Sequence, residues 1–184
     1  MSVMSDQWII RMSREKRMIE PFSPEQVRKG ISYGVSSYGY DISLADEFRL
    51  LNPDETDLID PKTITDQQFK TIKTNSLVLP ANTFALCRSR EYFRIPRDIL
   101  TVCFGKSTYA RCGVVVNITP FEPEWEGFAT ISLSNTAPRP VRVYASEGIA
   151  QLLFIRADEI CAQSYKDKKG KYQAQQEITL SKPD

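Results

Sequence analysis

The fold is decided by residues 105–135, which read GKSTYARCG (105–113), VVVNITPFEPEWEG (114–127) and FATISLSN (128–135). Short apolar runs alternate here with proline, glycine and asparagine, a pattern typical of strands joined by tight turns. The interval 105–112 has the length of a helical turn. Its cations and hydroxyl groups, from Lys106, Ser107, Thr108 and Arg111, are suited to binding phosphate oxygens. The alternative is an amphipathic turn with surface cations.

The letters GKS resemble the end of a P-loop, but that motif requires a glycine where Leu100 stands. The βαβ pattern that surrounds a P-loop is also missing, so this motif is excluded. Any phosphate site in this segment is therefore of another kind.

Over the rest of the chain, apolar runs between turn residues predict a mainly β fold. The architecture expected is a distorted double-sheet β-barrel or jelly roll. A helix is predicted over 5–19, and a second short helix is predicted from Ser23, because Ser-Pro-Glu-Gln is a typical helix start. Polar residues 157–184 predict a mobile tail or lid rather than a packed element. The predicted strands are 47–51, 75–79, 83–88, 99–104, 113–118, 127–134, 140–144 and 148–156.

The length of 184 residues favours a single domain, 1–184, with residues 1–30 as its helical N-terminal segment. A net charge of +1 gives no reason to expect a nucleic acid polymer as partner. No apolar run approaches the ~18 residues of a membrane span, and the N-terminus lacks the apolar region of a signal peptide. We therefore expect a cytoplasmic protein without a membrane partner. Its four cysteines lack CxxC spacing and are expected to be reduced thiols.

The chain contains no histidine. This excludes Ser-His-Asp and Cys-His nucleophile systems and every histidine-ligated zinc site. Any chemistry must use carboxylates, Lys, Arg, Tyr, hydroxyl groups, bound water or Mg²⁺.

Other segments have simpler interpretations beside functional ones. Tyr38 and Tyr40 alternate as on a strand and favour a packing and turn role. Trp125 could form a wall of a base pocket, although a buried tryptophan is more often part of the core. In the tail, Tyr165, Lys171 and Gln175 belong either to a disordered basic end or to a lid that closes over a triphosphate.

Together these motifs resemble the dCTP deaminase family of the trimeric dUTPase-like superfamily. The resemblance is carried by GKSTYARCG and NITPFEPEWEG, and by matches over nearly the whole chain. These include SYGVSSYGYD (32–41), FALCRSREYFRIPR (84–97), EGIAQLLF (147–154) and SYKDKKGKYQAQQ (164–176).

The resemblance implies a homotrimer with active sites at subunit interfaces that converts dCTP to dUTP and ammonia without zinc. Mg²⁺ would accompany the triphosphate, and dTTP could act as an inhibitor. By motif, Lys106, Ser107 and Thr108 would meet phosphates, with Ser107 also near the reacting centre, and Arg111 would position the catalytic water. The remaining residues implied at the substrate are Trp125, Thr130, Tyr165, Lys171 and Gln175.

The sequence departs from the family pattern at Ser132, where the family has the glutamate that acts as general base. A serine hydroxyl is a poor base near neutral pH, so the pattern predicts greatly reduced turnover. Three functions are therefore kept: a dCTP deaminase, a non-catalytic homotrimer that binds dCTP or dTTP, and a dUTP diphosphatase. The last would use Glu122 to activate water.

Overall fold

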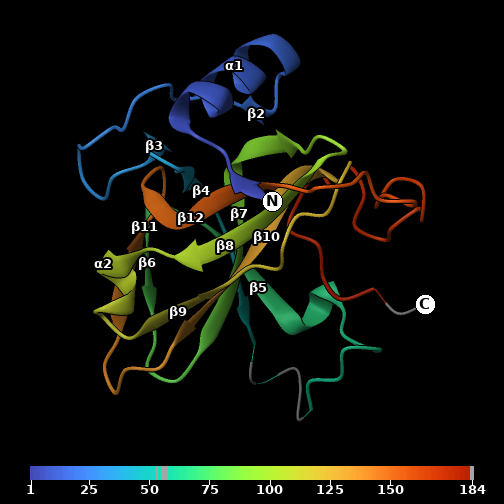
Figure 1. Cartoon of the computed structure of the whole chain (residues 1–184). Helices are drawn as coiled ribbons and strands as arrows, with labels where there is room; N and C mark the ends of the chain where they lie inside the picture. The colour runs from blue at the N-terminus through green and yellow to red at the C-terminus, as the bar shows by residue number, and fades with distance from the viewer. Residues whose placement is uncertain (53, 55–57, 183–184) are drawn as a thin grey trace.

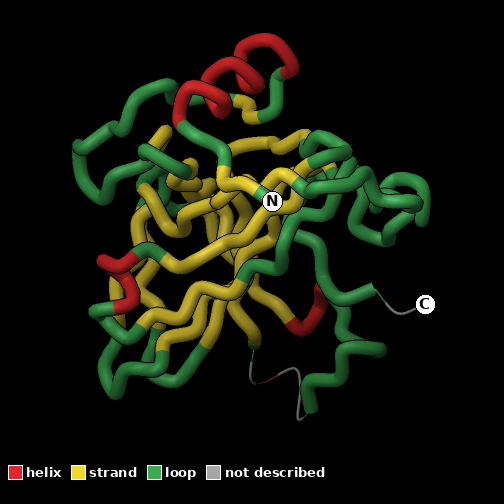
Figure 2. Tube along the Cα trace, in the orientation of Figure 1, coloured by secondary structure: helices red, strands yellow, loops and turns green. Residues whose placement is uncertain are grey.

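The computed structural model describes residues 1–52, 54 and 58–182, and most of its regular structure is β (Figure 1, Figure 2). Within these residues, ten strands form one curled antiparallel sheet with the main order β1-β12-β4-β7-β10-β9, and β6 and β11 form a two-stranded sheet. The expected mainly β fold is confirmed. The strands are β1 (Ser2–Val3), β2 (Ile19–Glu20), β3 (Gly34–Ser36), β4 (Gly39–Leu51), β5 (Phe69–Lys73), β6 (Ser76–Leu79), β7 (Phe84–Arg94), β8 (Ile99–Gly105), β9 (Val114–Asn117), β10 (Glu126–Asn135), β11 (Val141–Tyr144) and β12 (Gly148–Arg156).

The core fills the inside of the curled sheet. The large side chains of Tyr40, Phe48, Phe93 and Phe154, from β4, β7 and β12, are fully buried there. Along β10, buried and half-buried residues alternate strictly, as expected where successive side chains point to opposite faces. Ser132 therefore lies on the outer face of the sheet, opposite the core.

Helix α1 (Asp6–Lys16) covers one end of the sheet (Figure 1). It buries Trp8 and Ile9, and the Trp8 ring lies 5.8 Å from that of Phe154. The helix ends earlier than predicted, because Arg17 has a φ of 53° in the left-handed region. Residues 19–20 then pair with β7 as strand β2.

The second predicted helix, from Ser23, is wrong, so only part of segment 1–30 is helical. Val27 and Tyr33 exchange backbone hydrogen bonds of 2.8 and 3.2 Å, and the Ser23 carbonyl accepts the amide of Val35 at 3.2 Å. The backbone groups of this segment therefore pair with the following hairpin instead of with one another. The cap-like sequence did not produce a helix, because pairing with the hairpin satisfies backbone amides that a helix would otherwise have bonded.

The strands predicted beyond residue 75 are confirmed, although β7 extends to Arg94. Before them, the prediction 47–51 covers only the end of β4, and β3 and β5 were not predicted. Ser36 pairs with Gly39, so Tyr38 stands in a two-residue turn and is 61% exposed, whereas Tyr40 is buried on β4. The tyrosine alternation thus spans a hairpin turn rather than one strand. The helical turn expected within 105–112 is found as α2 (Ser107–Ala110).

The tail after β12 is packed against the sheet, contrary to the expectation of an unpacked segment. Ile178 is 1% exposed, and Gly127 forms a parallel bridge with Gln175. Strand β9 pairs only with residues 132–135 of β10, which leaves the edge near Gly127 open for the tail. A side chain at position 127 would meet Gln175 atoms at about 3.0 Å, so glycine permits this approach.

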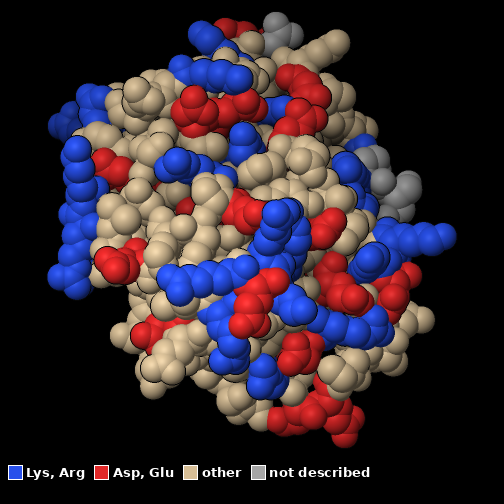
Figure 3. Space-filling model, turned by 90° about the horizontal axis from the view of Figure 1, so that it is seen from above, with Lys and Arg blue, Asp and Glu red and all other residues tan. Residues whose placement is uncertain are grey.

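Cys87, Cys103, Cys112 and Cys161 are all free thiols. Over most of the face in Figure 3, acidic and basic side chains are interleaved rather than gathered by sign. In the part of the chain that the structure describes, no helix is long and apolar enough to cross a membrane.

Candidate functional site

A cavity of about 830 Å³ lies between β10, the turn that precedes it and the C-terminal tail. It gathers several residues predicted from sequence, and its lining comes from three segments. These are residues 118–122 and 125, Ala129 and Thr130 on β10, and the tail positions 165, 168–172, 175 and 179–181.

The turn before β10 supplies a flat aromatic wall. The Trp125 ring stacks on Phe121 with centroids 4.5 Å apart and an interplanar angle of 30°. Its indole Nε1 donates a 2.9 Å hydrogen bond to the carbonyl of Tyr172, which ties this wall to the tail. Trp125 is thus part of the core, at 6% exposure, and it also lines the cavity, while its role beside a base stays a prediction.

Gln175 and Thr130 join the tail to β10 at the base of the cavity. The Gln175 side-chain amide donates to the Phe128 carbonyl at 2.5 Å and to the Thr130 hydroxyl at 3.3 Å. The same hydroxyl accepts the backbone amide of Thr179 at 3.1 Å. These bonds hold polar groups at fixed places at the base of the cavity.

The tail side of the cavity is cationic. Lys168, Lys169 and Lys171 all line it, and Lys171 Nζ donates to the Lys182 carbonyl at 2.9 Å. Lys168 pairs with Glu122 at 2.8 Å, and this contact raises the pKa of the lysine. Tyr165 accepts the Tyr172 amide on its hydroxyl at 3.0 Å. Cations beside hydroxyl and amide groups can bind a phosphate chain.

The other predicted residues lie away from this cavity, around α2. Ser107 and Thr108 are exposed at the start of the helix, and the exposed Arg111 donates to the Ser107 carbonyl at 3.1 Å. Lys106 instead points inward, where its ammonium group pairs with the buried carboxylate of Asp41. In Figure 1, α2 and the tail stand at opposite sides of the molecule.

Ser132 lies on β10 between these two groups, half-buried, with Leu86 and Asn117 as its strand partners. It shares the outer face of the strand with Thr130 but is not among the residues that line the cavity. The structure therefore brings together Trp125, Thr130, Tyr165, Lys171 and Gln175, and leaves Ser132, Lys106, Ser107, Thr108 and Arg111 outside that cavity.

Sequence reasoning missed the parts played by Phe121 and Tyr172. Phe121 stacks with Trp125, and two aromatic residues four positions apart in a proline-rich turn are a signal that could have indicated this. Tyr172 contributes its backbone carbonyl, and no residue type announces such a contact. Among the described residues, no three His, Cys, Asp or Glu side chains gather as a metal site.

Comparison with known proteins agrees with this architecture. Residues 3–157 match the family model described as dCTP deaminase-like. The chain is 55% identical over 187 residues to a dCTP deaminase of Nitrosomonas eutropha, covering 99% of this chain and 100% of that protein. It is 58% identical over 183 residues to one of Acidobacterium capsulatum, with the same coverage of each chain.

A solved structure, the 2′-deoxycytidine 5′-triphosphate deaminase of Agrobacterium tumefaciens, superposes with a TM-score of 0.65 at 14% identity. The match covers 84% of this chain but 48% of that one, so the chain spans about half the length of that relative. At this identity the likeness concerns the fold alone. From the family model and the full-length relatives, the chain belongs to the dCTP deaminase family.

Proposed function

We propose that this chain binds dCTP with Mg²⁺ and is built for its zinc-independent hydrolysis to dUTP and ammonia. The observation that carries the proposal is the convergence of Trp125, Thr130, Tyr165, Lys171 and Gln175 on one cavity. In the reaction, water adds to C4 of the cytosine ring and the bond from C4 to the exocyclic nitrogen breaks to release ammonia. The proposal places the protein in the cytoplasm, in keeping with its free cysteines.

The cavity suits a nucleotide because one wall is aromatic and the tail side is cationic. The stacked rings of Phe121 and Trp125 would face the sugar or base, while Lys171 and its neighbours would meet the triphosphate. Glu122, the carboxylate in the lining, is paired with Lys168. With that carboxylate already paired, a magnesium ion would be held mainly by the phosphate oxygens of the nucleotide. Such oxygen ligands from the substrate are typical for Mg²⁺.

We further propose that the site is completed between copies of the chain in a homotrimer. Strand β10 has ten residues and so spans ~30 Å at the usual rise per residue. The tail pairs with β10 near the first residue of that strand, at Gly127. The segment that follows α2 bonds just beyond the last residue of β10, where Gly113 accepts the amide of Thr136. A nucleotide that meets both groups would need α2 from one subunit and the cavity from another.

Position 132 decides how much activity is expected. We propose that Ser132 occupies the place of the family's general-base glutamate, so that water lacks its proton acceptor. Loss of a general base typically costs ~10²–10⁴-fold in rate. A protein that binds nucleotide yet turns it over very slowly is the expected result. The second candidate function, a nucleotide-binding homotrimer without catalysis, is favoured by this same serine.

Replacing Ser132→Glu tests the assignment directly. We expect dCTP-dependent ammonia release to rise by at least ~10²-fold, since a carboxylate can accept the proton of the attacking water. Ser134→Glu is the matched control, because Ser134 lies two residues further along the same strand face and is also half-buried. It should produce no gain.

Two results would separate the candidates. Equal ammonia release by the unchanged protein, the Ser132→Glu variant and the Ser134→Glu variant would show that position 132 does not hold the base. Calorimetric titration of the unchanged protein with dCTP and Mg²⁺ measures binding alone. Absence of binding at millimolar nucleotide would reject both the deaminase and the binding function.

A further inference from the structure

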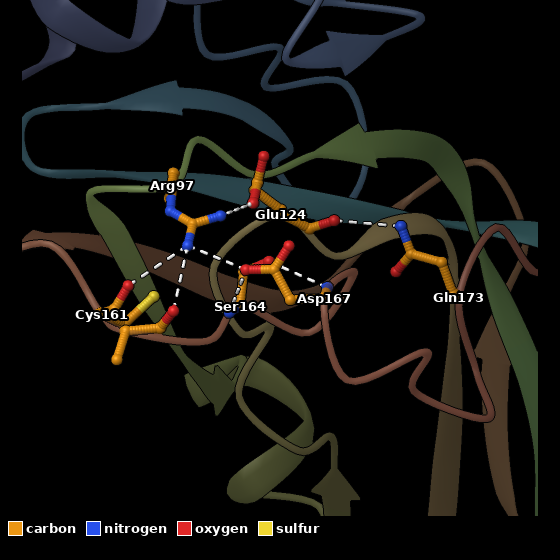
Figure 4. Close-up of polar contacts among 7 residues, drawn as sticks. Arg97, Glu124, Cys161, Ser164, Asp167 and Gln173 are labelled. Atoms are coloured by element: carbon orange, nitrogen blue, oxygen red, sulfur yellow. Dashed lines mark hydrogen bonds and ion pairs between the residues drawn. The ribbon is translucent and has the colours of Figure 1, made fainter.

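Arg97, in the loop between β7 and β8, does not line the cavity but binds residues that are close in sequence to its lining on both sides. Its Nη1 donates to the Glu124 carboxylate at 2.6 Å, and its Nη2 donates to the Asp167 carboxylate at 2.8 Å. Nη2 also lies 3.3 Å from the carbonyl of Cys161 and 3.4 Å from that of Ala162. Figure 4 shows the guanidinium between Glu124 on one side and Cys161 on the other.

The partners of Arg97 are direct chain neighbours of the cavity residues. Glu124 precedes Trp125, which forms the aromatic wall, and Asp167 belongs to the same tail turn as Tyr165. The backbone continues these links, because the Tyr165 amide donates to the Pro123 carbonyl at 2.9 Å. Gln173 Nε2 donates to the Glu124 carbonyl at 3.0 Å. A shift of Arg97 would therefore move the aromatic wall at Trp125 relative to the tail wall at Tyr165.

Ser164 completes the cluster on the tail side. It is 1% exposed, its amide donates to Asp167 Oδ2 at 3.0 Å, and its hydroxyl accepts the Asp167 amide at 3.2 Å. The hydrogen bond from the Ser164 amide, followed by that from Arg97, lowers the pKa of Asp167. The Ser164 hydroxyl likewise lowers the pKa of Glu124 ahead of Arg97. Both carboxylates are thus held in the charged form that Arg97 requires.

The backbone at Glu124 is strained, which also indicates that the turn is held by its contacts. Its φ of 61° lies in the left-handed region, which costs a non-glycine residue ~1 kcal/mol or more. A glutamate persists there while its carboxylate binds Arg97 and its carbonyl accepts Gln173. Trp125 follows directly, so the direction of the aromatic wall depends on this conformation.

We infer that Arg97 is a positioning residue that sets the separation between the aromatic wall at Trp125 and the tail wall at Tyr165. A planar guanidinium can donate to two carboxylates and to carbonyl groups at once, which a lysine cannot reproduce in the same geometry. The inference rests on the proposed nucleotide site, because the gap that Arg97 sets is the space the nucleotide would enter. Arg97 itself touches neither the cavity nor the substrate.

The test combines hydrogen–deuterium exchange with calorimetry on the full chain. In Arg97→Met we expect the amides of Tyr165 and Ala174, which bond to residues of the turn and β10, to exchange at least ~10-fold faster without nucleotide. The dissociation constant for dCTP with Mg²⁺ should rise ~10-fold. Asp167→Asn, which removes only the tail partner, should show the same changes to a lesser degree. Arg97→Lys should recover part of the loss.

Arg156→Met is the matched control. Arg156 is an arginine of similar exposure that pairs with Asp98 at 3.0 Å, next to Arg97 in sequence. It should leave both the tail amides and dCTP binding unchanged. Exchange in Arg97→Met and Asp167→Asn that equals this control would overturn the inference, as would faster exchange with unaltered dCTP affinity. If the unchanged protein binds no dCTP, the proposed function fails, while the exchange result still decides whether Arg97 holds the tail.

Discussion

At the residue scale, Glu91 stands out as a buried carboxyl group inside the sheet. It is 2% exposed and accepts the Ser43 hydroxyl at 2.7 Å and the Ser43 amide at 3.1 and 3.2 Å. Burial raises its pKa to about 7, and the bonds from Ser43 offset this only in part. The Tyr40 hydroxyl faces the same carboxyl group, and its pKa is raised by burial and then by Glu91. The interior therefore favours the protonated form of Glu91.

This environment predicts a stability that falls as pH rises. The pKa of Glu91 is about 7 in the folded chain against 4.5 for the unperturbed group. The free energy of unfolding should therefore decrease between pH 4.5 and 7 and then level off, by on the order of 3 kcal/mol. Urea denaturation followed by tryptophan fluorescence, repeated from pH 5 to 8, measures this slope. The absence of histidine leaves few other groups that titrate in the window.

Glu91→Gln provides the comparison, because glutamine keeps the shape of the side chain and cannot ionise. Its unfolding free energy should vary much less over the same pH range. A slope that persists undiminished in this variant would assign the pH dependence to another group.

At the element scale, the tail behaves as an additional edge of the sheet. It bonds to β10 through the Phe128 amide, which donates to Gln175 at 3.0 Å, and through the Ala174 amide, which donates to Glu126 at 2.9 Å. Beyond these bonds, Ile178 is buried. Apolar burial in addition to backbone pairing explains why a polar, lysine-rich segment is ordered.

Ile178→Ala should therefore destabilise the protein by ~2 kcal/mol. This is the lower end of the range for an isoleucine truncated in a core, because the tail lies at the rim of the core. Thermal denaturation gives the change. Ile160→Ala is the control on the same tail, since Ile160 is 59% exposed and its truncation should cost little. Similar melting temperatures for the two variants would mean that the tail adds nothing to stability.

At the scale of the whole molecule, the predicted site residues fall into two groups that one chain does not bring together. One group surrounds α2 and the other surrounds the cavity. If each site takes one group from each of two neighbouring subunits, damage to both groups on different chains can be compensated in a mixed assembly.

This is tested by refolding Arg111→Met and Gln175→Ala chains together. Each variant alone should bind dCTP weakly. In a random equal mixture, about a quarter of the sites would combine an undamaged α2 with an undamaged cavity, and these should regain full affinity. Calorimetric titration counts those sites. A mixture that binds no better than the separate variants would show that each site is formed within a single chain.

Apolar runs, turn residues and family motifs were sufficient to predict the mainly β fold, the later strands and α2 from the sequence. These features are local, because a strand that buries every second side chain shows an alternation of apolar and polar residues in its own sequence. The cap-like segment at Ser23 and the polar tail were misjudged, because the backbone of the first pairs with the hairpin that follows it and the backbone of the second pairs with β10. The pairing partner, rather than the residue types, decided both conformations.

The amino-acid sequence alone excludes histidine chemistry and shows serine at position 132. Other features became visible only in the folded chain: Trp125 and the tail share one cavity, Lys106 pairs with Asp41, and Arg97 bridges Glu124 and Asp167. The physical reason is that each of these contacts joins residues far apart in the chain. The curl of the sheet decides which distant residues form ion pairs and hydrogen bonds. A short sequence pattern does not show these partners.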